Sequence, residues 1–279
     1  MTKADRYLIS DINNILDFGY MDENPRPKYE DGTPAHTLSV NHVIRTYNLA
    51  KGEFPICTLR PQAWKTGLRE IFTIYQHPTN ILSEMRDMGV TWWDPWDIGD
   101  GTIGQRYGAT VKRYDLIHNL IEDIKKDPYG RRKVMSLWQE TDLRETAGLA
   151  PCAFLTIWNV RGKYLDMAMI QRSGDMLTAS GAGGINEIQY AGLLMMVAKV
   201  CSLTPGKFTH FVANEQIYDR HIENAHKMLA RGAMDITEGM PRLVLNKEAG
   251  CNFEDIKLED FEMLDYNPLK PQLKFELGI

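Results

Sequence analysis

Hydrophobic residues recur at helical spacing in several parts of the chain. In residues 4–18, Leu8, Ile12 and Leu16 repeat every four residues and Gly19 follows, which predicts an amphipathic helix that ends before the glycine. The same spacing predicts three further amphipathic helices, over residues 61–76, 114–126 and 222–231.

Residues 186–201 are apolar on nearly every side of a helix. Such a helix belongs in the centre of a core rather than on its surface. Asn186 stands at its start, and asparagine there is most often an N-cap. Capping is therefore the first interpretation of Asn186.

Shorter apolar runs bounded by turn residues predict β-strands. The runs 153–160 and 164–171 flank Arg161-Gly162 and predict a hairpin. Both are rich in large apolar residues, so we expect the sheet to be covered on both faces. Further strands are expected over residues 36–40, 133–138, 207–214 and 272–277. With no repeat, low-complexity tract or linker along the chain, residues 1–279 are expected to form a single domain.

The composition is that of an ordinary globular protein, with 43% hydrophobic residues among 279 and mixed charges. The net charge of -5 argues against non-specific nucleic-acid binding, although clustered arginines could hold a small anion. No apolar run is long enough to span a bilayer and no signal peptide is evident, so a cytoplasmic location is expected. The four cysteines are far apart and form no CxxC pair, so neither a metal site nor a redox motif is expected.

One cysteine stands in a context that suits chemistry. Cys152 follows a proline at the mouth of the first hairpin strand, and Arg172 follows the second strand. A thiolate is the nucleophilic form of cysteine, and a neighbouring guanidinium favours it. The alternative is a small buried core cysteine beside a surface arginine, which is the more common situation for an isolated cysteine.

Other candidates are less specific when taken alone. Glu70 lies among the apolar residues of the helix 61–76, where it is either exposed or buried with a raised pKa that suits proton transfer. Trp93 and Trp96 lie in a segment rich in glycine and aromatics, where they either wall a pocket for a flat ring or simply pack.

Arginines at two places could hold a phosphate. Arg131 and Arg132 precede a predicted strand, and Arg26 lies in a polar loop over residues 21–34. Phosphate binding is possible at both places. Composition alone favours solvated surface arginines.

Taken together and in order, these blocks resemble the folate-dependent thymidylate synthase family. The resemblance covers nearly the whole chain, and it is the number of blocks in one order that makes it specific. The matching blocks are residues 31–39, Glu70, Trp93-Asp94-x-Trp96, Gly104-x-x-Tyr107-Gly108, Arg131-Arg132, Pro151-Cys152, Gln171-Arg172-Ser173-x-Asp175, Asn186-x-x-x-Tyr190, Gln216-Ile217-Tyr218 and an apolar C-terminal residue.

The resemblance implies an α/β (α+β) fold with a large mixed β-sheet packed with helices, one face of which pairs two subunits of a homodimer. It implies a methyltransferase that methylates carbon 5 of dUMP with 5,10-methylenetetrahydrofolate, which supplies both the carbon and a hydride. It implies no metal, no membrane and no required nucleic acid.

The resemblance also assigns roles to residues. Cys152 would attack carbon 6 of the uracil, Glu70 would organise water for proton transfers, and Tyr107 would help to remove the proton from carbon 5. Asn186 would pair with N3-H and O4, which fits uracil because an amide both donates and accepts. The remaining implied contacts are to the phosphate (Arg26, Arg172, Ser173, with Arg131 and Arg132 from the partner subunit), to the rest of the nucleotide (Asp175, Gln216, Tyr218) and to the folate (Trp93, Trp96, Asp175, Ile279).

Three departures keep alternatives open. Gln216 stands where the family usually has histidine, and Gly174 stands where a larger polar residue is common. The segment 178–185 is longer than the family's short loop and carries three glycines. A looser loop could admit water, so a dUMP hydroxymethylase on the same scaffold is one alternative, and a non-catalytic nucleotide-binding homologue is another.

Overall fold

A seven-stranded mixed β-sheet forms the framework of the protein, which we describe from a computed structural model covering residues 1–234 and 239–279. Its strands run in the order β1-β2-β7-β5-β4-β3, and β6 pairs with β7. The pairs β5–β7 and β6–β7 are parallel and the others antiparallel, which confirms the predicted mixed sheet. The strands are β1 (Tyr20–Met21), β2 (Thr37–Asn48), β3 (Val134–Ser136), β4 (Ala153–Arg161), β5 (Tyr164–Gln171), β6 (Gly174–Asp175) and β7 (Thr204–Tyr218).

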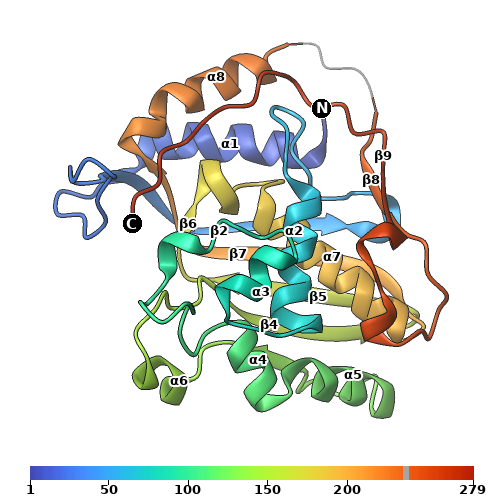
Figure 1. Ribbon diagram of the computed structural model, residues 1–279. Coiled ribbons are helices and arrows are strands. Elements are labelled where there is room, and N and C mark those ends of the chain that lie inside the picture. The colour runs from blue at the N-terminus through green and yellow to red at the C-terminus, as the bar shows by residue number, and fades with distance from the viewer. Residues whose placement is uncertain (235–238) are drawn as a thin grey trace.

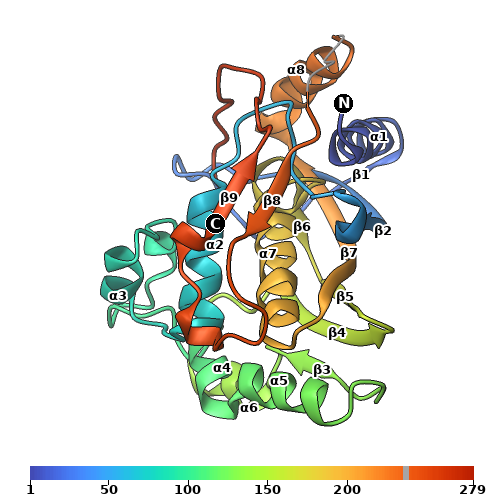
Figure 2. The same ribbon diagram turned by 90° about the vertical axis from the view of Figure 1, so that its right-hand side faces the viewer.

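Helix α7 (Ile185–Val200) lies at the centre of the molecule, between the sheet and α2 (Trp64–Ile71) (Figures 1 and 2). Fourteen of its residues are buried, as its all-round apolar sequence predicts. A separate two-stranded sheet, β8 (Arg242–Leu245) with β9 (Phe261–Leu264), was not predicted. The other helices are α1 (Lys3–Phe18), α3 (Leu82–Asp87), α4 (Gly108–Tyr114), α5 (Leu116–Lys126), α6 (Glu140–Glu145) and α8 (Ile222–Gly232).

Short helical turns connect these elements. Two of them are π-helical and follow directly on candidate site residues: η2 (Phe72–Gln76) continues α2 beyond Glu70, and η4 (Met176–Ser180) begins after Asp175. Such π-turns are frequent at functional sites. The 3₁₀ turns are η1 (Leu49–Lys51), η3 (Asp94–Trp96), η5 (Asp219–His221), η6 (Phe253–Asp255) and η7 (Leu258–Asp260).

Helices cover only one face of the central strands. Figure 2 shows α7 and α2 on one side of β5 and β4, with no helix on their outer side. On that outer side, paired positions of four neighbouring strands form an apolar row that is not fully buried, made of Ile44, Phe211, Ile170 and Leu155. The expectation that both faces are covered is therefore met on one face within the chain.

The predicted strand over residues 272–277 is wrong. This segment runs over α8 without strand pairing, and its carbonyl groups accept hydrogen bonds from side chains. Asn224 Nδ2 donates to Lys274 O at 2.7 Å, and His221 Nε2 contacts Glu276 O at 2.7 Å. Apolar and polar residues do alternate here, but the segment packs on a helix surface rather than pairing with a strand.

The helix predicted over residues 61–76 also begins later than predicted. Helix α2 begins at Trp64 and gives way to η2 after Ile71. The strands around residues 36–40 and 207–214 are longer than predicted, because β2 and β7 pair with each other over their whole length.

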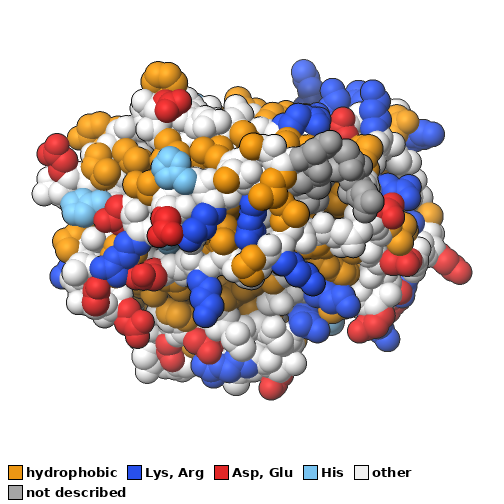
Figure 3. All heavy atoms as spheres, turned by 90° about the horizontal axis from the view of Figure 1, so that it is seen from above, with side chains coloured by type: hydrophobic (Ala, Val, Ile, Leu, Met, Phe, Trp, Pro, Cys, Tyr) orange, Lys and Arg blue, Asp and Glu red, His pale blue; other side chains and the backbone are white. Residues whose placement is uncertain are grey.

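Surface charge is mixed on the face that carries α1 and α8. Seen from above, acidic and basic side chains are interspersed there, with several lysines and arginines gathered near one end (Figure 3). Among the described residues, no helix is long and apolar enough to cross a membrane.

Candidate active site

Cys152 and Arg172 are brought together, as predicted. Arg172 Nη2 lies 3.5 Å from Cys152 Sγ. The guanidinium is fixed on the cysteine's own segment, since Nη2 also donates to Ala150 O at 2.8 Å and Nε donates to Pro151 O at 3.0 Å. Cys152 is half-buried, so its sulfur is not sealed in the core.

The protonation of Cys152 reflects two opposing effects. Burial raises the pKa of the thiol, and the Arg172 charge lowers it without cancelling the effect of burial. In the single chain the thiol is therefore the main form at neutral pH. The predicted neighbour is present, but it is not sufficient to hold a thiolate alone.

Tyr107 packs against the same segment. Its hydroxyl accepts a hydrogen bond from Cys152 N at 3.2 Å. Tyr107 is a non-glycine residue with φ of 46°, a strained backbone conformation that is common at functional sites. Burial raises the pKa of its phenol well above the usual value, so Tyr107 acts as a neutral hydroxyl.

Glu70 is buried, which settles the choice that its sequence left open. Its carboxylate accepts hydrogen bonds from Trp93 Nε1 at 2.9 Å and from Gln189 Nε2 at 2.6 Å. Burial raises the pKa of Glu70 to about 7 against the effect of these hydrogen bonds. A carboxyl group with this pKa can both give and take a proton near neutral pH.

Asn186 is not an N-cap, so the first interpretation of this residue was wrong. Gly184 occupies the cap position of α7, and Asn186 lies inside the first turn. Its Nδ2 donates to Gln189 Oε1 at 3.0 Å, and its Oδ1 accepts from Ser180 Oγ at 3.2 Å. Through Gln189, the Asn186 amide is linked to Glu70.

Several polar groups predicted to bind ligands gather around Tyr218 at the end of β7. Burial raises the pKa of Tyr218 to about 12. Asp175 and Cys152 add to this effect and Arg26 opposes it, so all three residues influence the Tyr218 hydroxyl. Gln216 pairs with Asp175 in the β6–β7 ladder. Ser173 is half-buried just before β6.

Asp175 carries an unsatisfied buried oxygen. Its Oδ2 accepts from Thr178 Oγ1 at 2.5 Å, but Oδ1 has no hydrogen-bond partner among the described residues. His221 Nδ1, 3.7 Å from Oδ1, has none either. Since buried polar atoms are normally paired, this position can receive a ligand that donates hydrogen bonds.

The C-terminal residue is tied to the loop that contains Arg26. Ile279 N donates to Lys28 O and Lys28 N donates to Ile279 O, both at 2.9 Å. Ile279 is therefore held in place by backbone pairing. Arg26 itself is exposed.

Arg131 and Arg132 are not brought to Cys152 within the chain. Both are exposed just before β3, at the edge of the sheet, and make no side-chain ion pair within residues 1–234 and 239–279. Trp96 is half-buried and meets Trp93 edge to face, with ring centroids 5.7 Å apart. Trp93 is buried and also contacts the Tyr107 ring.

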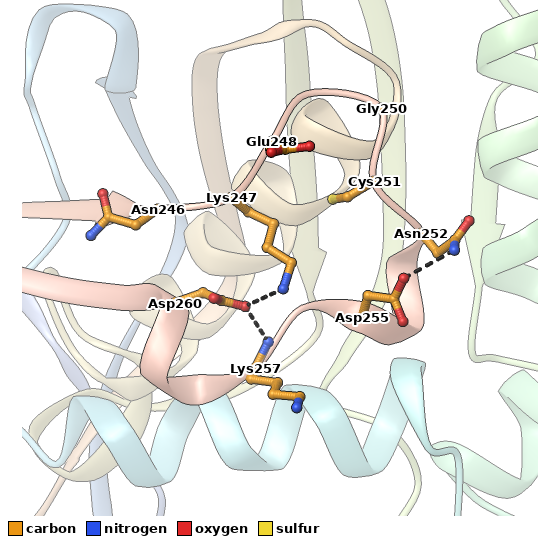
Figure 4. Close-up of a pocket in the computed structure, with 9 residues that line it drawn as sticks. All are labelled: Asn246, Lys247, Glu248, Gly250, Cys251, Asn252, Asp255, Lys257 and Asp260. Carbon is orange, nitrogen blue, oxygen red and sulfur yellow. Dashed lines mark hydrogen bonds and ion pairs between the residues drawn. The ribbon is translucent and has the colours of Figure 1, made fainter.

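A separate crevice of about 880 Å³ is lined by the segment that connects β8 to β9 (Figure 4). Its polar groups satisfy one another: Lys247 Nζ and Lys257 N both bond Asp260, and Asn252 bonds Asp255. It contains none of the predicted site residues. Among the described residues, no group of three His, Cys, Asp or Glu is placed to hold a metal ion.

Comparison with known proteins decides the family. The family model described as "Thymidylate synthase" matches residues 6–279. The chain belongs to the thymidylate synthase family. The family predicted from the sequence motifs is thus confirmed.

Individual members of this family match over their full length. A thymidylate synthase of Lactococcus lactis subsp. cremoris is 51% identical over 285 residues, and one of Streptococcus gordonii is 47% identical, each with 100% of both chains covered. The thermostable thymidylate synthase A of Bacillus subtilis has a TM-score of 0.87 at 30% identity, over 99% of both chains. The predicted thymidylate synthase fold is confirmed by this likeness.

One departure from the family pattern has a local physical reason in this chain. Gly174 is buried, and a Cβ added there would lie 2.6 Å from Ser180 Cβ and 3.3 Å from Val212 Cγ1. A larger residue does not fit, because Ser180 of the longer loop takes the space.

The prediction from sequence missed three polar residues of the site: Gln189, Ser180 and the side chain of Gln171. Gln189 lies three positions after Asn186, so helical spacing places both on one face and could have indicated the link. Nothing in the local sequence indicated that Ser180 turns inward.

Proposed function

We propose that this chain is an enzyme that converts dUMP to dTMP, with 5,10-methylenetetrahydrofolate as donor of the carbon and of a hydride. The observation that carries the proposal is the Cys152 sulfur, half-buried and held beside Arg172. The full-length relatives named thymidylate synthase support it.

In the proposed reaction, the Cys152 thiolate bonds to carbon 6 of the uracil, and the electron pair moves to carbon 5 and O4 as an enolate. Carbon 5 then bonds to the folate methylene. Loss of the carbon 5 proton and cleavage of the bond to the folate nitrogen leave an exocyclic methylene. Hydride from tetrahydrofolate completes the methyl group, the sulfur leaves, and dihydrofolate is released.

Glu70 and Tyr107 would serve the proton steps. With a pKa of about 7, Glu70 can protonate and deprotonate water near O4 and the folate nitrogen. Tyr107, a neutral hydroxyl on the Cys152 segment, would orient the water that takes the carbon 5 proton.

Recognition would use polar groups that keep hydrogen-bonding capacity for a ligand. Asn186 would accept from N3-H and donate to O4 of the uracil, and Tyr218 and Gln216 would contact the ribose. The unsatisfied Asp175 Oδ1 fits a donor group of the folate pterin. Trp93, Trp96 and the Ile279 carboxylate would complete the folate side and its closure.

The phosphate site would be formed by residues of two chains. Arg26, Arg172 and Ser173 would hold it from one chain, and Arg131 and Arg132 would reach it from a partner in a homodimer. The apolar row of Ile44, Phe211, Ile170 and Leu155, which the chain itself leaves incompletely buried, supports a sheet-to-sheet interface, and the two arginines lie just before the edge strand β3 of the same sheet. The extra positive charge would also favour the Cys152 thiolate. We place this dimer in the cytoplasm, where the four free cysteines stay reduced.

The product decides between the proposal and its alternatives. Purified protein, dUMP and methylenetetrahydrofolate should give dTMP and an equimolar amount of dihydrofolate. The formation of dihydrofolate can be monitored by its rise in near-ultraviolet absorbance. Hydroxymethyl-dUMP with tetrahydrofolate would instead identify a hydroxymethylase. Tight dUMP binding without tritium release from carbon-5-labelled dUMP would identify a non-catalytic binder.

A further inference from the structure

A continuous line of buried hydrogen bonds runs from Glu187 to the site amide. Glu187 Oε1 lies 3.0 Å from His210 Nδ1, and His210 Nε2 lies 3.0 Å from Gln171 Oε1. Gln171 Nε2 then donates to Ser180 Oγ, and Ser180 Oγ donates to Asn186 Oδ1 at 3.2 Å. Glu187, His210 and Gln171 are all at most 1% exposed, so water cannot replace these contacts.

The backbone fixes the direction of this line. Gln171 Nε2 donates to the carbonyl oxygen of Ser173 at 3.0 Å and to Ser180 Oγ at 2.9 Å. A carbonyl oxygen only accepts, so turning the Gln171 amide over would place two oxygens in contact. The oxygen of Gln171 must therefore face His210.

It follows that His210 Nε2 carries a hydrogen. The Glu187 side of the ring is also a hydrogen-bonded contact, so one more hydrogen lies between Nδ1 and the carboxylate. Burial lowers the pKa of His210 and Glu187 opposes this effect, while the contacts of Glu187 with His210 and Arg45 lower the pKa of that carboxyl against its own burial. In either position of the shared hydrogen, Nε2 remains a donor.

A buried group of charges surrounds this pair. The Arg45 guanidinium contacts three carboxylates, those of Asp11, Glu187 and Glu215. Burial raises the pKa of Glu215 to about 7 and also raises the pKa of Asp11, which offsets part of the excess negative charge. The His210 ring contacts this group at Glu187.

We propose that the buried Glu187–His210 pair is a positioning device that fixes the orientation of the Asn186 amide through Gln171, and with it the preference for uracil over cytosine. The role rests on the proposed function, in which Asn186 contacts the base. With Gln171 fixed, Ser180 Oγ accepts from Gln171 and turns its own hydrogen to Asn186 Oδ1. Oδ1 is therefore held as the acceptor side of the Asn186 amide and Nδ2 as the donor side, facing Gln189.

This orientation matches uracil. Nδ2 keeps a second hydrogen for O4, and Oδ1, with two lone pairs, can accept from the Ser180 hydroxyl and from N3-H at the same time. Cytosine offers an acceptor at N3 and a donor at the amino group, so it needs the opposite amide orientation. A site that loses the His210 donor would lose part of this discrimination.

A matched pair of variants tests the role. His210→Gln can keep a donor at the position of Nε2, whereas His210→Leu cannot. The readout is the ratio of the dCMP dissociation constant to the dUMP dissociation constant in binary complexes, because the folded fraction cancels from a ratio. We expect the ratio to fall about tenfold in His210→Leu, the scale of one buried hydrogen bond, and to stay near the wild-type value in His210→Gln. An unchanged ratio in His210→Leu, or equal losses in both variants, would overturn the proposal.

A measurement on the wild-type protein covers the case in which the leucine variant does not fold. Nitrogen NMR of the His210 ring should show a hydrogen-bearing Nε2 at neutral pH, and a bare Nε2 would refute the mechanism. Both readouts are independent of turnover. A chain that binds dUMP but makes no dTMP would overturn the proposed reaction while still reporting on His210.

Discussion

The two ends of the proposed dUMP site are built differently. At the base end, the side chains of Glu70, Gln189 and Asn186 are hydrogen-bonded to one another before any ligand arrives. At the phosphate end, Arg131 and Arg132 are exposed and make no side-chain ion pair in the described chain. The base end is organised by the core, and the phosphate end is left to be completed.

This difference separates residues that should affect the chemical step from residues that should affect affinity. Fixed groups at the base end lose little freedom when the reaction occurs, which favours effects on the chemical step. Long exposed arginines must be ordered upon binding, which favours effects on affinity. Substitutions at the two ends should therefore separate in kcat and KM.

Replacement of the nucleophile should have the largest effect at the base end. In Cys152→Ala we expect kcat to fall by at least about 10⁴-fold, since no other group can bond to carbon 6. Dissociation constants for dUMP should change little by comparison, as equilibrium dialysis can measure. Cys251→Ala, at the remote crevice of Figure 4, is the matched control. Retained turnover in Cys152→Ala would remove the cysteine from this role.

Glu70→Gln should lower kcat by about 10²- to 10³-fold, with a smaller change in the KM for dUMP. It also has a signature in stability. The pKa of Glu70 is raised from 4.5 to about 7 in the folded chain, so the folded state takes up a proton between these pH values. This proton uptake stabilises the folded state by roughly 3 kcal/mol below pH 4.5, and the stabilisation is lost as the pH rises to 7.

Denaturant unfolding at several pH values checks this sign. Relative to the wild type, Glu70→Gln should become more stable as the pH rises from 5 to 8. Glu215→Gln, which removes another buried carboxyl with a pKa of about 7, should change stability in the same direction with a far smaller loss of kcat, because Glu215 faces Arg45. A kcat loss as large as that of Glu70→Gln would contradict the distinction.

Arg132→Ala and Arg131→Ala should raise the KM for dUMP roughly 10- to 100-fold, the value of a charge-assisted hydrogen bond, with a smaller change in kcat. Arg144→Ala removes an exposed arginine paired only with Glu140 and should leave both constants unchanged. Mixing Arg132→Ala with Cys152→Ala under subunit exchange tests sharing, with dUMP well below the KM of Arg132→Ala so that this variant alone turns over slowly. About a quarter of the wild-type activity at the same dUMP concentration should return, since half of the dimers are mixed and each has one intact site. No recovery, with exchange demonstrated, would place the arginine outside the partner's site.

The smallest effect is expected where the base end meets the longer loop. Gly174→Ala should cost about 1–3 kcal/mol of unfolding free energy, because its methyl group would overlap Ser180 Cβ. The double variant Gly174→Ala, Ser180→Gly should recover most of that loss. Additive losses in thermal or denaturant unfolding would show that the two residues do not compete for space.

The sequence was sufficient for the parts whose signals are local. The helical periodicity of residues 4–18, the hairpin around Arg161-Gly162 and the all-apolar helix after Asn186 all appear in the structure, as does the contact between Cys152 and Arg172. The contact was predictable because two neighbouring strands of a hairpin place their ends together.

Features that depend on distant partners could not be predicted in the same way. Whether Glu70 is buried depends on Trp93 and Gln189, which only the packed fold brings to it. The segment 272–277 looked like a strand because its alternation is genuine, but its partner is the side-chain surface of α8. The β8–β9 pair joins residues about 20 positions apart and has no turn signal that sequence reasoning could use.

The docked C-terminus has a practical consequence for preparing the protein. Ile279 is paired on both sides of its backbone with Lys28, and a Cβ at Gly278 would lie within 2.9 Å of Tyr218 and Ala35. A purification tag fused after Ile279 would therefore begin beside the loop that contains Arg26, close to the proposed phosphate and folate positions. Tags belong before the exposed Met1, at the other terminus.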